Sequence, residues 1–326
     1  MNENAPAPTD LFFSLTPHKV LEAVEAAGVP CNPVCYPLSS FENRVYEVER
    51  EDRSRVVAKF YRPGRWTEAQ ILEEHAFLAE LVEEELPVCP PRPFPGGGTL
   101  RSIEGIFYCL FDRAGGRAPD ELDDGLLERL GMLAGRMHNV GAARPGVSRP
   151  RIDADTMVRQ ELAWMEQRGS VPQGILPRYA GAARRIADLA DERMRGAEVH
   201  RLHGDLHFGN LLLRDGVLRV VDFDDMAIGP AVQDLWLLAP GRGEDADRQR
   251  AVLVEGYERM RHFDWPTLRM VEPLRGLRMV RYAAWLARRW HDPIFPRTWP
   301  HFGTASYWLE ETRALEEILE LSTAEN

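Results

Sequence analysis

The spacing of hydrophobic residues changes along the chain, from a β-rich beginning to a mostly helical remainder. Thr16 and Pro17 begin a first helix that Gly28 ends, because a capping threonine, a first-turn proline and a terminal glycine are typical helix signals. Strand-like apolar runs then alternate with one further helix as far as residues 106–111. After residues 114–119, which suggest a hinge, apolar residues recur mostly at helical spacing.

This order predicts an α+β, bilobal fold, with a small β-rich lobe at residues 1–112 and a larger, mostly α-helical lobe at residues 113–326. Two local signals are stronger than the rest. Thr67 and Gln70 form a capping box at the start of a helix, and an Asp-Gly pair at residues 215–216 between two apolar runs predicts a hairpin. A hairpin brings its two ends together, so the residues that flank it should be neighbours.

Two polar motifs flank this hairpin. H-G-D-L-H-F-G-N occupies residues 203–210, and V-D-F-D-D occupies residues 221–225. Asp205 precedes Asn210 by five positions, which is the offset between the catalytic aspartate and the metal-binding asparagine of protein kinases. Asp222 corresponds to the aspartate at the head of D-F-G, and the two motifs together predict a kinase catalytic centre.

These residue types suit phosphoryl transfer, in which the protein mainly positions the reactants and neutralises charge. Asp205 can align an acceptor hydroxyl and take its proton, and Asp222 is the second residue we expect to be catalytic. Asn210 and Asp222 offer oxygen ligands of the kind that Mg²⁺ prefers, and the hairpin would place them close enough to share one ion. ATP is the expected co-substrate.

A second interpretation of the first motif has less support. G-D-x-H at residues 204–207 also occurs in metallophosphoesterases, where His203 and His207 would be metal ligands. That site would need an upstream D-x-H and a downstream G-N-H-D, which the sequence lacks. We therefore expect both histidines to fix the loop through hydrogen bonds.

Lys59 ends a β-branched run that resembles the kinase strand V-A-I-K, whose lysine contacts the nucleotide phosphates. It is one of two lysines among 40 basic residues, which indicates that an ammonium is needed there rather than a guanidinium; a surface charge is the alternative. Such a lysine needs an acidic partner on the next helix. We expect Glu74 rather than Glu73 or Glu80, because a packing stripe from Phe77 onward places Glu74 near the buried side.

The loop expected over the phosphates lies at residues 37–46 and contains no glycine, unlike the G-x-G-x-x-G loop of protein kinases. Ser40 and the backbone N–H groups around it are expected to contact the nucleotide, with an ordinary hairpin turn as the alternative. Adenine is expected in a cleft between the lobes, against the backbone near Phe111 and Asp112.

The order of these motifs resembles the bacterial stress response kinase A family, in the aminoglycoside phosphotransferase group of the protein-kinase-like fold. H-G-D-x-H-x-G-N is shared by the whole group, whereas S-x-E-N-R-V-Y from Ser40 and K-F-Y-R-P-G-R-W from Lys59 are more specific. The resemblance continues through E-P-L-R at residues 272–275 to the W-L-A-R-R-W-H-D-P segment from Trp285.

This resemblance implies an ATP- and Mg²⁺-dependent Ser/Thr protein kinase that acts on protein substrates. It makes Asp205 the proton acceptor, Asn210 and Asp222 the Mg²⁺ ligands, and Ser40 an ATP contact. Asp224 stands where D-F-G has glycine and no A-P-E follows, so an activation-loop switch is not expected. Three functions remain open: a protein kinase, a kinase of small alcohols such as an aminoglycoside, choline or homoserine, and an idle nucleotide-binding module. Only the resemblance favours a protein acceptor.

Composition narrows the partners and the location. The net charge of −11 disfavours a general nucleic-acid binder, and the four cysteines lack a zinc or redox spacing, which predicts reduced thiols. The first residues lack the features of a signal peptide, and no apolar run is long enough to span a bilayer. We therefore expect a cytoplasmic monomer without membrane or nucleic-acid partners.

Overall fold

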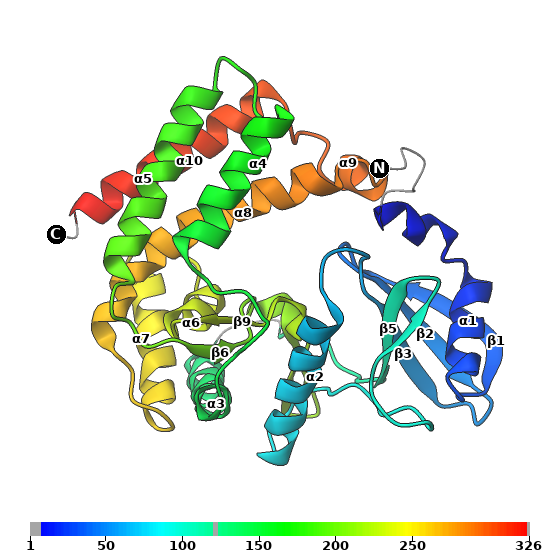
Figure 1. The fold of residues 1–326 in the computed structure, drawn as a ribbon. Helices are drawn as coiled ribbons and strands as arrows, with labels where there is room; N and C mark the ends of the chain where they lie inside the picture. The colour runs from blue at the N-terminus through cyan, green and yellow to red at the C-terminus, as the bar shows by residue number, and fades with distance from the viewer. Residues whose placement is uncertain (1–7, 120–122, 325–326) are drawn as a thin grey trace. The chain divides into compact units, whose positions relative to one another are not determined.

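The computed structural model describes residues 8–119 and 123–324, drawn as ribbons in Figure 1. The chain forms two compact units. Unit 1 comprises the described residues within Met1–Glu121 together with Phe208–Asp224, and unit 2 comprises those within Leu122–His207 and Asp225–Asn326. The chain therefore enters unit 1 a second time within the first polar motif, at Phe208, and leaves it within the second, after Asp224.

Unit 1 is built on an antiparallel sheet with the strand order β1-β2-β3-β5-β4. Val, Ile, Tyr and Phe are frequent in its central strands, as expected for residues that favour a pleated, half-buried surface. The strands are β1 (Cys31–Leu38), β2 (Arg44–Arg50), β3 (Arg55–Phe60), β4 (Arg101–Ile103) and β5 (Ile106–Asp112).

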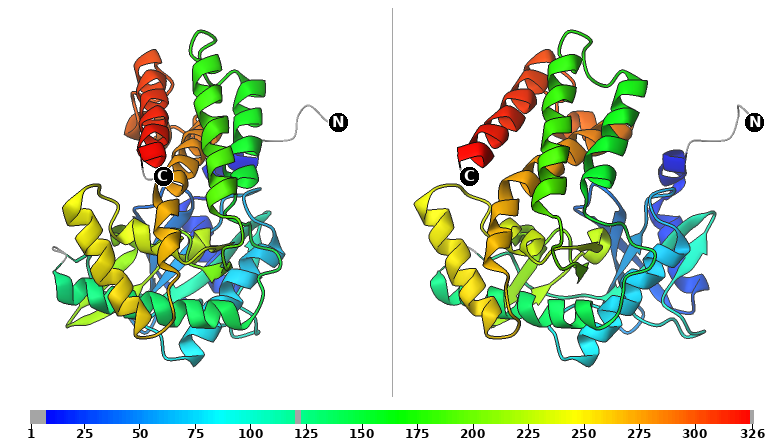
Figure 2. Two further views of the ribbon diagram at one scale, coloured as in Figure 1. Left: turned by 90° about the vertical axis from the view of Figure 1, so that its left-hand side faces the viewer. Right: turned by 60° about the vertical axis from the view of Figure 1, so that its left-hand side comes forward.

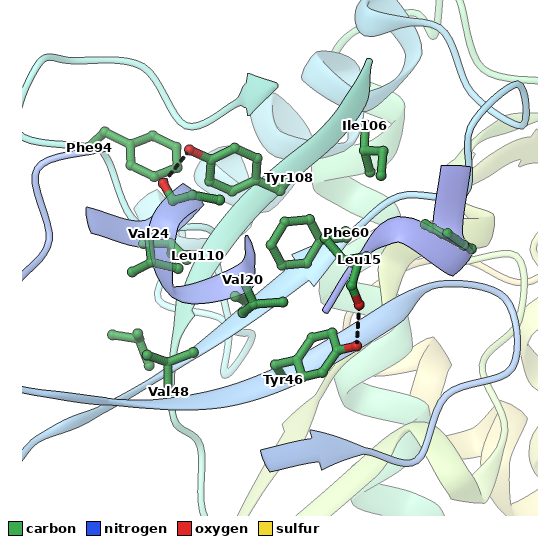
Figure 3. Close-up of a cluster of buried hydrophobic side chains, with 14 residues drawn as sticks. Leu15, Val20, Val24, Tyr46, Val48, Phe60, Phe94, Ile106, Tyr108 and Leu110 are labelled. Carbon is green, nitrogen blue, oxygen red and sulfur yellow. Dashed lines mark hydrogen bonds between the residues drawn. The ribbon is translucent and has the colours of Figure 1, made fainter. Parts of the chain in front are cut away.

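One face of this sheet packs against α1 (Pro17–Ala26), which follows the short 3-10 helix η1 (Pro8–Ser14). The Thr16 hydroxyl accepts the Lys19 N–H at 3.3 Å, so the predicted helix start is confirmed. Figure 3 shows Val20 and Val24 packed among strand residues that include Phe60 and Tyr108. The Tyr108 hydroxyl donates to the Ala23 carbonyl at 2.7 Å, which satisfies its polar end inside the core.

The opposite face carries α2 (Glu68–Glu83). Side chains alternate between the faces of a strand, so Phe60 joins the α1 core while Lys59 and its cross-strand partner Cys109 point toward α2. Thr67 and Gln70 form the predicted capping box at the start of α2. The sheet therefore presents one lysine to the buried side of this helix.

The predicted hairpin is also present in unit 1, as β7 (Leu211–Arg214) and β8 (Val217–Val220). Asp215 and Gly216 have φ values of 51° and 77°, the left-handed conformation that a tight Asp-Gly turn requires. Beyond the strands, the Val221 N–H donates to the Asn210 carbonyl at 3.0 Å. The ladder thus brings Asn210 beside the residue that precedes Asp222, as the sequence predicts.

Unit 2 is mostly helical, with one small antiparallel sheet of β6 (His200–Leu202) and β9 (Ala227–Gly229). Figure 2 shows α10 alongside α5 in both views. The helical elements are α3 (Asp124–Ala143), the π-helical turn η2 (Asp155–Arg159), α4 (Gln160–Arg168), α5 (Leu176–Arg193), α6 (Val232–Leu238), α7 (Glu244–Glu258), η5 (Trp265–Met270), α8 (Val271–Arg289), α9 (Ile294–Thr298) and α10 (Ala305–Ala324).

The predicted α+β fold is confirmed by the sheet of unit 1 and the helices of unit 2. The division at residues 112 and 113 stays a prediction; it treats each lobe as continuous, whereas Phe208–Asp224 groups with unit 1. All four cysteines are free thiols. Within residues 8–119 and 123–324, no helix is both long and apolar enough to cross a membrane.

Candidate active site

Unit 1 gathers four charged side chains, Lys59, Glu74, Asp222 and Asp224, which we call the Lys59 cluster. The Lys59 Nζ atom lies 3.1 Å from Asp224 Oδ1, 3.3 Å from Asp222 Oδ1 and 3.7 Å from Glu74 Oε1. Three of the four side chains are buried, whereas the side chain of Asp222 is 56% exposed. The cluster therefore has one carboxylate that reaches solvent.

The charge of Lys59 is stabilised by this arrangement. Burial alone would lower the pKa of the Lys59 ammonium, but the carboxylates of Asp224, Glu74 and Asp222 raise it well above its ordinary value. Three carboxylates around one ammonium leave a net negative charge in the cluster. A bound metal cation would neutralise this excess negative charge, so the cluster is electrostatically suited to bind one.

Arg65 extends the Lys59 cluster toward the loop between β1 and β2. Its guanidinium forms an ion pair with Asp224 and lies 3.6 Å from the carboxylate of Glu42 in that loop. Arg62 donates from Nε to the Glu42 carbonyl at 2.9 Å, and its own N–H donates to Asn43 Oδ1 at 3.1 Å. The two specific sequence motifs, S-x-E-N-R-V-Y and K-F-Y-R-P-G-R-W, thus meet in one ion-paired network.

This network explains how a loop without glycine keeps its shape. A glycine-rich loop is flexible, whereas this loop is fixed by the side chains of two arginines that follow β3. Ser40 lies in the loop, partly buried, two residues before Glu42. Its contact with a nucleotide stays a prediction.

Asp222 lies on a turn and has a left-handed backbone conformation. Its φ of 62° places it in the left-handed region, which aspartate and asparagine tolerate better than most residues. Phe223, the next residue, is buried and packs edge-on against Phe77 of α2 with 6.0 Å between ring centroids. Packing of Phe223 on Phe77 fixes residues 222–224, while the carboxylate of Asp222 remains exposed to solvent.

Phe111 and Asp112, predicted to lie near adenine, are at the end of β5. Phe111 packs beside the buried cluster of Tyr61, Ile71 and Cys109. The carboxylate of Asp112 is 78% exposed and pairs with Arg92. The two residues pair with Val57 and Val56 of β3, and their role in nucleotide binding stays a prediction.

Asp205 belongs to unit 2, in the loop from Leu202 to His207 that we call the catalytic loop. The carboxylate Oδ2 lies 3.4 Å from His207 Nε2, and Oδ1 lies 2.7 Å from Arg278 Nη1 of α8. Burial would raise the pKa of the Asp205 carboxyl, but the hydrogen bond with His207 and the charge of Arg278 lower it below its ordinary range. Asp205 is therefore ionised at neutral pH.

The backbone of the catalytic loop is held by one buried carboxylate, Asp234 of α6. Its two oxygens accept the N–H groups of His203 and Gly204, each at 2.9 Å. His138 Nε2 lies 3.1 Å from the same carboxylate, and the Tyr257 hydroxyl lies 3.0 Å from His138 Nδ1. This buried chain of hydrogen bonds fixes the loop on which Asp205 stands.

Local contacts complete the loop. The Asp205 N–H donates to His203 Nδ1 at 3.2 Å, consistent with a structural role for that histidine. Gly204 has a φ of 84°, and a Cβ atom there would lie 2.1 Å from the Asp225 carbonyl oxygen, so only glycine fits. The H-G-D sequence is therefore needed for the shape of the loop as well as for its chemistry.

The structure brings Lys59, Glu74 and Asp222 together in unit 1, while no side-chain contact links Ser40 or the Phe111–Asp112 pair to them among the interactions described above. Sequence reasoning did not assign a role to three side chains at the site: Asp224, Arg65 and Arg278. Asp224 lies closer to Lys59 than Glu74 does. The sequence feature that could have identified it is its position, because it replaces the glycine of D-F-G. Arg65 stood in a specific motif, but Arg278 is far from both motifs and gave no local signal.

Comparisons with known proteins agree with this geometry. Residues 34–271 match the model of the phosphotransferase enzyme family. Stress response kinase A of Escherichia coli strain K12 is 40% identical over 309 residues, covering 94% of this chain and 93% of that protein. A Salmonella typhimurium protein named serine/threonine protein kinase RdoA is 39% identical over 320 residues, covering 97% of this chain and 95% of that protein.

Solved structures show the same fold at lower identity. An amicoumacin kinase has a TM-score of 0.75 at 18% identity and 95% coverage of both chains. A microcompartment-associated aminopropanol kinase has a TM-score of 0.68 at 18% identity, covering 93% of this chain and 96% of that one. With a family match over most of its length and curated relatives near 40% identity, the chain belongs to the phosphotransferase enzyme family, alongside the stress response kinases of that family.

Proposed function

We propose that the chain transfers the γ-phosphoryl group of ATP to Ser or Thr hydroxyls of proteins, with Mg²⁺ as the metal. The observation that carries the acceptor class is identity near 40%, over nearly the whole chain, to proteins named stress response kinase A and serine/threonine protein kinase RdoA. The geometry that supports the chemistry is an ionised Asp205 on a rigid loop and a buried ammonium surrounded by carboxylates. A cytoplasmic location and a monomeric state belong to the same proposal.

The residues at the two ends of the hairpin fit Mg²⁺. Asp222 is an exposed carboxylate on a turn, and the Asn210 carbonyl accepts the N–H of Val221, the residue before Asp222. The side chains of Asn210 and Asp222 both offer hard oxygen ligands. Within the described residues, no group of three or more His, Cys, Asp or Glu side chains is arranged to hold a metal. Mg²⁺ needs few protein ligands, because it keeps waters and binds phosphate oxygens. When bound, it would neutralise charge on the phosphates.

The chain's own residues supply the remaining steps. Lys59 binds the phosphates, and Glu74 with Asp224 orients its ammonium. Ser40 and the loop around it contact the phosphates, and the backbone at Phe111 and Asp112 receives adenine. Asp205 aligns the acceptor hydroxyl and takes its proton as the oxygen attacks phosphorus.

The test is transfer of label from [γ-³²P]ATP by the purified chain with Mg²⁺. We expect acid-stable phosphate on Ser or Thr of the chain itself or of casein and myelin basic protein, and none with Asp205→Asn. A parallel set of reactions contains choline, homoserine or kanamycin. Phosphorylation of one of these alcohols, with no labelled protein at any time point, would contradict the protein acceptor and leave the phosphotransferase chemistry in place.

A further inference from the structure

Arg278, which lies outside both polar motifs, forms an ion pair with Asp205, the proposed proton acceptor. Arg278 Nη1 lies 2.7 Å from Asp205 Oδ1, while His207 lies near the other oxygen, Oδ2. The Arg278 side chain is 37% exposed and the Asp205 side chain 22%, so the pair is neither fully buried nor free in solvent. Both residues belong to unit 2, and the pair does not depend on how the units are placed.

Arg278 is presented by a rigid helix. On α8, Leu274, Leu277 and Val280 are buried. A Cβ atom at Gly276 would lie 2.7 Å from Ile186 Cγ2, so glycine allows α8 to approach α5 closely. Fixed donors stabilise a transition state better than mobile ones, because they need no reorganisation during the reaction.

A strong cation at this place is unfavourable for simple base catalysis. A positive charge beside a carboxylate lowers its pKa and weakens it as a proton acceptor. The same charge is favourable for a group that becomes more negative during the reaction. In phosphoryl transfer, negative charge is spread over the three equatorial oxygens of the transferring group, and arginines are commonly used to neutralise it.

We propose that Arg278 is a catalytic residue that donates hydrogen bonds to the transferring phosphoryl group while it remains beside Asp205. The acceptor oxygen must come within about 3 Å of Asp205 for proton transfer, and the phosphorus follows one bond-forming distance further on. A guanidinium has five N–H donors in a planar fork, so one edge can keep the Asp205 contact while another faces phosphate oxygens. The proposal rests on the proposed phosphoryl transfer and not on the identity of the acceptor.

The step is balanced without further reactants. The acceptor oxygen forms a bond to the γ-phosphorus as the bond from phosphorus to the β,γ-bridging oxygen breaks. The hydroxyl proton goes to the Asp205 carboxylate, and ADP leaves with the bonding electron pair. Arg278 neither gains nor loses a proton in this step; its fixed charge stabilises the equatorial oxygens.

A purely structural ion pair is the alternative, and the same helix contains a matched example. Arg288 Nη2 lies 2.6 Å from Glu161 Oε2, and the Arg288 side chain is 36% exposed. It also stacks on Trp164, with 4.0 Å from its guanidinium carbon to the ring centroid. Arg288 therefore serves as a control for the loss of a half-exposed arginine from α8.

The test compares ATP turnover by Arg278→Gln, Arg278→Lys, Arg278→Ala and Arg288→Gln. We expect kcat to fall by about 10²–10³-fold in Arg278→Gln with the KM for ATP nearly unchanged, and the loss to persist across the pH range. Arg278→Lys should have a higher kcat than Arg278→Gln, because lysine keeps the positive charge, but a lower kcat than the parent, because it lacks the planar guanidinium donors. Millimolar guanidinium should raise kcat of Arg278→Ala several-fold, and Arg288→Gln should retain the parent kcat. Circular dichroism and thermal unfolding verify that each variant is folded.

Three results would overturn the proposal. The first is a parent-like kcat in folded Arg278→Gln. The second is a loss that disappears at high pH, which would mean that Arg278 only tunes the protonation of Asp205. The third is an increase confined to the KM of an acidic acceptor, which would make Arg278 an acceptor-binding residue. Because ATP turnover is followed with whichever acceptor the parent uses, failure of the protein-acceptor proposal leaves this test intact.

Discussion

In the Lys59 cluster of unit 1, one ammonium is shared by three carboxylates, whereas in the catalytic loop of unit 2 one carboxylate, Asp234, accepts two backbone N–H groups. The first arrangement is held mainly by charge: Lys59 donates one hydrogen bond, to Asp222 at 3.3 Å, and lies 3.1 and 3.7 Å from the carboxylates of Asp224 and Glu74. The second is held by two hydrogen bonds of 2.9 Å to the buried carboxylate of Asp234. Coulombic contacts tolerate changes of partner, while hydrogen bonds fix direction as well as distance.

The difference corresponds to what each region must do in the proposed reaction. A site for a polyphosphate and its metal must exchange partners as ligands bind and leave, so Lys59 can trade a carboxylate for a phosphate oxygen. A proton acceptor must instead stay within a few tenths of an ångström of one position, since small displacements are costly in catalysis. We therefore expect substitutions in the Lys59 cluster to act on ligand binding, and those under the catalytic loop to act on rigidity.

The largest effect is expected at the one carboxylate of the Lys59 cluster that reaches solvent. Asp222→Asn keeps the shape and the left-handed backbone, but removes the charge that would bind Mg²⁺. Loss of this ligand should lower Mg²⁺-dependent turnover by about 10³-fold or more, measured as ADP production. Asp52→Asn, which removes a carboxylate of similar exposure from a surface turn of unit 1, should have no effect. Equal activity of Asp222→Asn and the parent would remove Asp222 from the mechanism.

The second prediction concerns rigidity. Asp234→Ala leaves the N–H groups of His203 and Gly204 without their acceptor, and each unpaired buried donor costs roughly 1–3 kcal/mol. We expect the free energy of unfolding to fall by about 2–4 kcal/mol in urea titrations, together with a lower kcat. Asp188→Asn, on an exposed position of α5, should change stability by less than about 0.5 kcal/mol. A free energy of unfolding for Asp234→Ala equal to that of the parent would show that the catalytic loop is fixed by other contacts.

Sequence reasoning predicted most of the architecture, because the signals were local. The capping box at Thr67 and the Asp-Gly turn at residues 215–216 each depend on a few neighbouring residues. It also selected Glu74, which forms the expected ion pair with Lys59. These elements could be predicted since periodicity and capping depend on residues that are near one another in the sequence.

The rest of the site depends on tertiary packing that the sequence does not reveal locally. Arg278 of α8 contacts Asp205 although the two residues are 73 positions apart, and α8 packs closely on α5 at Gly276. Asp224 was noticed as a departure from D-F-G, but its position nearest Lys59 follows from the turn at Asp222 and the anchor at Phe223. Long-range contacts of this kind require the assembled fold.

The third prediction tests how far the Lys59 cluster tolerates exchange. Lys59→Arg keeps the charge among the three carboxylates, yet a planar fork is bulkier than an ammonium and directs its donors differently. We expect the fold to be retained and kcat/KM for ATP to fall by about 10–100-fold. Lys19→Arg is the matched control, because Lys19 is the other lysine and pairs with Glu104 on the surface. Unchanged kinetics in Lys59→Arg would mean that only net charge matters in the cluster.

The smallest effect is expected at a partly buried carboxyl, Glu311, for which no neighbouring cation offsets the burial. Burial and the neighbouring charge of Glu310 raise the pKa of Glu311 in α10 from 4.5 to about 7. The folded chain therefore keeps a proton on Glu311 that the unfolded chain loses, so stability due to this group declines as pH rises from about 4.5 to about 7. This sign is opposite to that at Asp205, where His207 and Arg278 hold the pKa low despite burial.

Glu311→Gln removes the titration and keeps the shape of the neutral acid. At pH 8 the variant should be more stable than the parent by about 1–3 kcal/mol, and at pH 4 the two should agree. Urea unfolding at both pH values measures the difference, and ATP turnover should be unchanged because the substitution lies outside the Lys59 cluster and the catalytic loop. An equal effect of Glu311→Gln at both pH values would show that packing, not the ionisation of a partly buried carboxyl, determines stability at this position. The contrast between the lowered pKa of Asp205 and the raised pKa of Glu311 would then have no consequence for stability at Glu311.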